Sequence, residues 1–269
     1  MATHQTAKTL YVSSQKTTFA YRRFGTDDGV PLLFLIHFRG TMDKWDPLLI
    51  NSIAKNRPVI LVDYAGVGQS TGRVAASFRE SAEDIASFLS LIGVKEVDIL
   101  GFSIGAFVAQ LIALNTKKEI LKVRKLIICA SSASVGPDMP ETSNDYVTAA
   151  TAKDLIVDQF KTLFFPRNDI GEEACEKWWS RLKERNEETS GETPSDWASQ
   201  GYQDGGLAMQ TQGAAYAAFQ DPEKSRGLDG SYSRLGDLQM PVLVAQGSVS
   251  EAYLVESRCL SWMQLVATY

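Results

Sequence analysis

Short apolar runs alternating with helix-like segments constrain this chain more than any other feature of its sequence. Each run is rich in Val, Ile and Leu without a polar face, a pattern typical of strands buried on both sides of a sheet. The runs cover 31–37, 57–64, 96–102, 124–130 and 241–247. Because parallel strands need helical crossovers between them, this alternation predicts an α/β fold with a doubly wound, mostly parallel sheet.

Local patterns predict the elements around these runs. Residues 10–13 and 18–24 alternate in polarity and are expected to form an antiparallel hairpin. Segment 77–93 has apolar residues at helical spacing, with Ser77 as N-cap, Glu80 completing a capping box, and a glycine just past its end. Segment 104–115 is apolar on nearly all sides, which predicts a helix buried under the sheet.

The alternation stops in the stretch 137–236. This stretch is polar, contains tryptophans and has no strong strand pattern, but 152–164, 171–187 and 205–219 are helical candidates. A stretch of this length is too long for a connecting loop. We therefore expect a helical cap at 137–236, inserted into an α/β core made of 1–136 and 237–269.

Composition excludes several classes of function. The 269 residues are 44% hydrophobic and carry a formal net charge of −5, with no basic stripe. Nucleic acid and anionic membrane are therefore not expected partners, and no apolar run is long enough for a membrane span or a signal peptide. The odd number of dispersed cysteines (Cys129, Cys175 and Cys259) predicts a reduced, cytoplasmic protein. Cys129 lies in an apolar run and is expected to be buried.

Metals and cofactors are not expected either. The two histidines, His4 and His37, and the scattered cysteines do not form a standard zinc spacing. His4 is expected to lie in a disordered tail. The glycines of 66–72 have a spacing one residue too long for a dinucleotide-binding loop.

The sequence ILGFSIGAF (99–107) places Ser103 between Gly101 and Gly105, directly after a predicted strand and before a predicted helix. A serine on a sharp strand-to-helix turn projects its hydroxyl from the sheet, where it can attack a substrate. Glycines on both sides relieve the crowding of such a turn, and the helix N-terminus offers free N–H groups to an oxyanion. The alternative is that Ser103 is only a turn residue.

With two further motifs, the chain resembles the α/β-hydrolase family. His37-Phe38-Arg39-Gly40 follows the first buried run, and DYAGVGQS (63–70) follows the second. The resemblance spans 9 to about 247 and implies that Ser103 is the nucleophile and that the Ile104 N–H is an oxyanion donor. It places the second donor at Phe38 or Arg39 and makes His37 structural, with a base role for His37 as the alternative. It implies a small-molecule substrate.

The same resemblance shows what is missing. The family's triad runs serine, acid, histidine along the chain. Ser250 stands about where the acid is expected, beside Glu251, and no histidine follows His37. Asp138 is an alternative acid in some members. The family's last strand and helix also have no counterpart, and 251–266 are expected to form a helix at the sheet edge.

Three explanations stay open for this incomplete triad: a truncated or mis-spliced form of an active enzyme, a degenerate non-catalytic protein, or an enzyme with an unusual base. The expected ancestral function is cofactor-free hydrolysis or acyl transfer on a small apolar ester, thioester or lactone. A weaker similarity points to fungal specialised-metabolite pathways. The alternative is a ligand-binding protein that uses the cap pocket. Trp178, Trp179 and Trp197 either line that pocket or pack the cap on the core.

Overall fold

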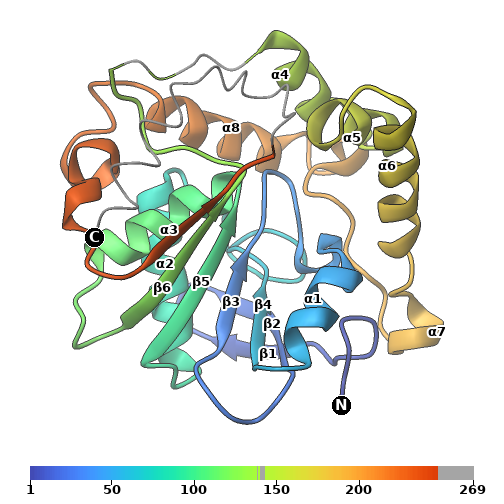
Figure 1. Cartoon of the computed structure of the whole chain (residues 1–269), viewed down its shortest axis with the longest axis horizontal. Helices are drawn as coiled ribbons and strands as arrows, with labels where there is room; N and C mark the ends of the chain where they lie inside the picture. The colour runs from blue at the N-terminus through green and yellow to red at the C-terminus, as the bar shows by residue number, and fades with distance from the viewer. Residues whose placement is uncertain (138, 140–142, 248–269) are drawn as a thin grey trace.

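The computed structural model describes residues 1–137, 139 and 143–247, and within them the predicted α/β sheet is present (Figure 1). Its seven strands have the order β1-β2-β4-β3-β5-β6-β7. The first two form the predicted hairpin with the predicted bounds, and β2 also pairs antiparallel with β4. The pairs β3–β4, β3–β5, β5–β6 and β6–β7 are parallel. The strands are β1 (Leu10–Ser13), β2 (Thr18–Phe24), β3 (Leu32–Leu35), β4 (Val59–Val62), β5 (Glu96–Phe102), β6 (Lys122–Cys129) and β7 (Val242–Ala245).

The order of the central strands determines where a site can form. β4 and β5 lie on opposite sides of β3, so the connections that leave the carboxyl ends of β3 and β5 run in opposite directions. In open α/β sheets such a switch point leaves a crevice at the carboxyl ends of the strands, where ligands bind. The segments that begin at Ile36 and Ser103 therefore start side by side, since Leu35 pairs with Gly101.

The core helices follow the sequence prediction closely. They are α1 (Pro47–Ala54), α2 (Phe78–Leu91) and α3 (Ile104–Asn115). Ser77 caps α2 by accepting a hydrogen bond from the Glu80 N–H, and the Glu80 carboxylate accepts one from the Ala76 N–H. Every residue of α3 from Ile104 to Ile112 is buried, and the helix packs on β3, β5 and β6.

The stretch between β6 and β7 is helical, and its described part contains no strand. Figure 1 shows α4, α5 and α8 beyond the carboxyl ends of the central strands. The expected helix 152–164 is only partly correct, because α5 begins at Val157 and a separate short helix precedes it. The helices are α4 (Asn144–Ala150), α5 (Val157–Phe164), α6 (Asp169–Arg181), α7 (Glu187–Ser190) and α8 (Leu207–Phe219).

Three expectations about burial are wrong. His4 is buried, not part of a disordered tail: Asn51 Oδ1 accepts a hydrogen bond from its backbone N–H, and its Nε2 lies 3.2 Å from the Met42 carbonyl oxygen. Cys129 is only half-buried, because it lies at the carboxyl end of β6. β7 alternates between half-buried and exposed residues, since it is the edge of the described sheet. The predicted helix at 251–266 lies outside the described residues.

Candidate active site

Ser103 occupies a strained turn between β5 and α3. Its backbone angles are φ 55° and ψ −123°. Residues other than glycine rarely adopt this conformation, which costs on the order of 1–3 kcal/mol. The neighbouring glycines allow this turn. A Cβ on Gly101 would lie 2.4 Å from the Ala106 Cα, and one on Gly105 would lie 2.0 Å from the Leu35 carbonyl oxygen. Both contacts are with backbone, so only glycine fits at either position.

Hydrogen bonds from the end of β6 hold this strained residue in place. The Ser103 N–H donates to the Cys129 carbonyl oxygen over 3.0 Å. The Ser131 hydroxyl donates to the Ser103 carbonyl oxygen over 2.9 Å. The backbone on both sides of the Ser103 side chain is therefore fixed by the end of β6 and the residues that follow it.

Of the alternative oxyanion donors, Arg39 is already engaged. Its backbone N–H donates to the side-chain oxygen of Gln212 on α8 over 2.9 Å. Within the described residues, the N–H groups of Phe38 and Ile104 have no hydrogen-bond acceptor. Since these two groups follow adjacent strands β3 and β5, they are the pair of donors that the turn leaves available.

The Arg39 side chain ties the loop after β3 to the helical insertion. Its guanidinium is fully buried and donates to five main-chain carbonyl oxygens. Arg39 itself has a positive φ of 61°, which turns the chain back over the sheet. The acceptors are Ala150, Ala152, Lys153, Ala198 and Ser199. One buried cation thus pairs with carbonyl oxygens from two separate segments of the insertion.

The side chain of His37 is held by the backbone and by aromatic rings packed around it. Its Nδ1 lies 2.9 Å from the Phe38 carbonyl oxygen, and because a carbonyl only accepts, that nitrogen carries the proton. Its ring contacts those of Phe102, Phe164 and Trp197 at centroid distances of 5.4, 5.0 and 5.6 Å. Burial lowers the pKa of His37 to about 4, so the imidazole is neutral at physiological pH. No hydrogen bond joins it to Ser103 in the described part of the chain.

The tryptophans take part in packing. A second apolar cluster, the insertion cluster, contains Ala150, Leu155, Phe160, Leu163, Cys175 and Trp197. Trp178 and Trp179 pack against it, and so does Phe38 from the loop after β3. Trp197 is 5% exposed and stacks on Trp179 with an interplanar angle of 7°. Trp178 and Trp179 therefore pack within the insertion, and Trp197 also contacts the ring of His37 in the loop after β3.

Tyr146 on α4 is a residue that the sequence does not single out. Its half-buried ring packs against the insertion cluster. Burial raises the pKa of Tyr146 above its ordinary value. The phenol is therefore neutral at physiological pH. A single tyrosine in a polar stretch gives no sequence signal.

Four further residues come into question as site groups from the sequence: Asp138, Ser250, Glu251 and His4. Asp138, Ser250 and Glu251 lie outside the described residues. His4 is held near Met42 and Asn51, at the amino-terminal segment. Among the residues that the structure covers, no group of His, Cys, Asp or Glu side chains could hold a metal ion, and no helix is long and apolar enough to cross a lipid bilayer.

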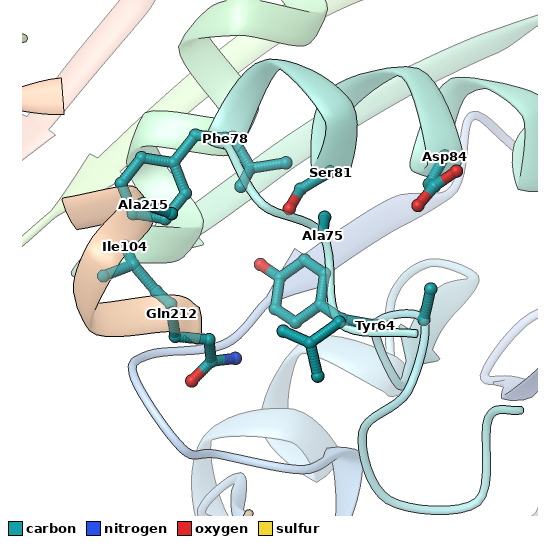
Figure 2. A pocket seen from close by; sticks show the side chains of 11 residues that line it. Tyr64, Ala75, Phe78, Ser81, Asp84, Ile104, Gln212 and Ala215 are labelled. Carbon is teal, nitrogen blue, oxygen red and sulfur yellow. The ribbon is translucent and has the colours of Figure 1, made fainter. Parts of the chain in front are cut away.

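A small cavity borders the turn on the side of α2 and α8 (Figure 2). Its volume is about 20 Å³, room for one water molecule. Ile104, Gln212 and Tyr64 line it, and Figure 2 shows Asp84 at its far end. This cavity is too small for an organic substrate.

Comparison with known proteins agrees with this geometry. The family model described as alpha/beta hydrolase fold matches residues 31–249, most of the chain. The chain belongs to the α/β-hydrolase fold family. The match covers β3 to β7, including the turn at Ser103 and the helical insertion.

Two solved structures are similar to this chain over most of their length. An alpha/beta hydrolase fold protein from Chitinophaga pinensis is 28% identical, with a TM-score of 0.77, and the match covers 97% of this chain and 87% of that one. A thermophilic esterase from Thermogutta terrifontis shares the fold at 19% identity, with a TM-score of 0.62 and coverage of 92% and 82%.

Curated relatives match over a shorter length. The Azorhizobium caulinodans protein named "Putative carbamate hydrolase RutD" is 33% identical over 93 residues, which is 34% of this chain and 35% of that protein. A second one, the acetyltransferase component of an acetoin cleaving system from Cupriavidus necator, is 31% identical over 25% of its own length. The chain thus aligns with about a third or less of each.

Proposed function

We propose that this α/β hydrolase descends from cofactor-free enzymes that hydrolyse or transfer the acyl group of a small apolar ester, thioester or lactone. In this proposal Ser103 attacks the carbonyl carbon, and the N–H groups of Ile104 and Phe38 hold the oxyanion. The observation that carries it is the strained turn at Ser103, which two glycines permit and the end of β6 holds. Strain of this kind persists where the surrounding structure maintains it for a function.

The helical stretch 137–236 is proposed to act as a cap over this site. Its helices lie beyond the carboxyl ends of the central strands, and Arg39 binds two of its segments. The apolar rings of Phe102 and Phe164 near the turn favour an apolar substrate over a charged one.

Covalent labelling tests the proposal. A fluorophosphonate should modify the folded protein at Ser103 alone, as read by mass spectrometry of its peptides, and the Ser103→Ala variant should not react. Modification of another residue while Ser103 stays free would count against a nucleophilic role.

We further propose that turnover is poor, because the described residues place no histidine beside Ser103. In serine proteases the loss of a triad member lowers kcat by about 10⁴ to 10⁶. The same observation favours a second candidate function, a non-catalytic ligand-binding protein. Ester turnover of the purified chain, compared with Ser103→Ala, separates the two: equal rates favour binding alone.

A further inference from the structure

We propose that Gln212 on α8 is a positioning residue of this site, which holds the loop after β3 so that the Phe38 N–H stays directed at the oxyanion. The inference rests on the proposed function, in which Ser103 attacks and Phe38 is an oxyanion donor. Its basis is a buried hydrogen bond of 2.9 Å, in which the Arg39 N–H donates to Gln212 Oε1. Gln212 itself is 5% exposed.

The loop after β3 is a tight turn of four residues, from His37 to Gly40. The Gly40 N–H donates to the His37 carbonyl oxygen over 3.0 Å, which closes the turn. At the second central residue, Arg39, φ is 61°, whereas Phe38 has no positive φ. This is the sign pattern of a type II turn, which favours glycine at that second position. Since an arginine stands there, the turn is held against the preference of its own backbone.

Two side chains hold the central peptide of this turn, which joins Phe38 to Arg39. His37 Nδ1 donates to the Phe38 carbonyl oxygen over 2.9 Å, and Gln212 Oε1 accepts from the Arg39 N–H. Rotation of this peptide by a half-turn would convert the turn to type I and relieve the positive φ, but it would break both hydrogen bonds. Of the two partners, Gln212 is the one that belongs to the insertion. The turn therefore keeps its conformation only while α8 is in place.

Gln212 also lies close to the residue that carries the other proposed donor. Its side chain and that of Ile104 line the same small cavity, as Figure 2 shows. A donor stabilises an oxyanion best when it is fixed before the reaction, because no reorganisation is then needed as the charge develops. By fixing the turn that carries Phe38 beside the start of α3, Gln212 preorganises the pair of donors.

Gln212→Met tests the inference, because it keeps a side chain of similar length and volume but removes the acceptor. The assay is modification of Ser103 by an alkyl fluorophosphonate over a range of probe concentrations, which gives kinact and KI separately. In this reaction Ser103 Oγ bonds to phosphorus, fluoride leaves, the serine proton passes to solvent, and negative charge develops on the phosphoryl oxygen. Gln212→Glu is the conservative variant, since it keeps an oxygen acceptor at the same place. Gln210→Met is the matched control, because Gln210 is exposed on the same helix.

Removal of a whole oxyanion donor slows a reaction by about 10² to 10³. Because Gln212→Met loosens the loop but leaves the donor, we expect kinact to fall about tenfold with KI unchanged, and Gln212→Glu and Gln210→Met to stay within about twofold of wild type. An unchanged kinact, a change in KI alone, or an equal loss in Gln212→Glu would overturn the inference while Ser103 remains the nucleophile. Rates refer to protein that circular dichroism shows to be folded, and Gln212→Asn, whose oxygen falls short of Arg39, replaces a methionine variant that does not fold. If the wild-type chain forms no adduct at Ser103, the proposed function fails and this inference fails with it.

Discussion

Substitution of Gly105 by alanine is the sharpest test of the strand-to-helix turn. The new Cβ would lie 2.0 Å from the Leu35 carbonyl oxygen, 2.5 Å from its carbon and 2.8 Å from the Ile36 carbonyl oxygen. Real Cβ atoms essentially never come closer than 3.0 Å to such atoms, so α3 must move away from β3 by about 1 Å. Gly105 has no positive φ, so the effect comes from the collision and not from backbone preference.

Overpacking of this kind costs about 1–3 kcal/mol, and occasionally more. Because backbone atoms of a central strand cannot yield as side chains do, we expect about 3 kcal/mol for Gly105→Ala. A domain of this size loses roughly 2–4 °C of melting temperature per kcal/mol, which predicts a drop of about 6–12 °C. Ser103 also moves with α3, so fluorophosphonate labelling should slow in the folded variant.

Gly213→Ala is the matched control. Gly213 lies inside α8, and a Cβ there would meet nothing within 4 Å. Since alanine favours a helix interior over glycine by about 0.5–1 kcal/mol, this variant should melt at the wild-type temperature or slightly above. Thermal unfolding followed by circular dichroism compares the two. A melting temperature of Gly105→Ala within about 1 °C of wild type would refute the close contact between α3 and β3.

Three further predictions concern the same region. In urea, the free energy of unfolding of Ser103→Gly should exceed that of Ser103→Ala by about 1 kcal/mol, because only glycine adopts φ 55° without strain. The reverse order would contradict a strained turn. Arg39→Lys should lower the free energy of unfolding in urea by about 2–5 kcal/mol, because an ammonium cannot reach all five carbonyl acceptors and each one left unpaired costs about 1–3 kcal/mol. The control, Arg73→Lys at an exposed position, should change stability by less than about 0.5 kcal/mol. Similar effects of the two substitutions would argue against a structural role for the Arg39 guanidinium. Burial lowers the pKa of His37 from 6.5 to about 4. Between these two pH values the unfolded chain therefore binds a proton at His37 that the folded chain does not. The stability that His37 contributes above pH 6.5 is lost as the pH falls to about 4. On acidification from pH 7 to pH 4, wild type should therefore lose up to about 3 kcal/mol more than His37→Phe; parallel pH profiles of their unfolding free energies would show that His37 is solvated.

The sequence by itself determined the elements and the order of the motifs. Apolar runs, capping residues and helical periodicity are local signals, so the hairpin, the core strands and helices α2 and α3 could be placed within a few residues. The turn at Ser103 could also be predicted, because its strain has a local remedy in the glycines on each side. The family resemblance rests on these local motifs and agrees with the match over 31–249.

Only the tertiary structure decided how distant segments meet. Whether Phe38 or Arg39 has the free N–H depends on Gln212, which is more than 170 residues away along the chain. The burial of His4 depends on contacts with Met42 and Asn51, which lie 38 and 47 residues away along the chain. No periodic pattern encodes such contacts, because they join side chains from separately folded segments whose relative placement is fixed by packing and by buried groups such as the Arg39 guanidinium.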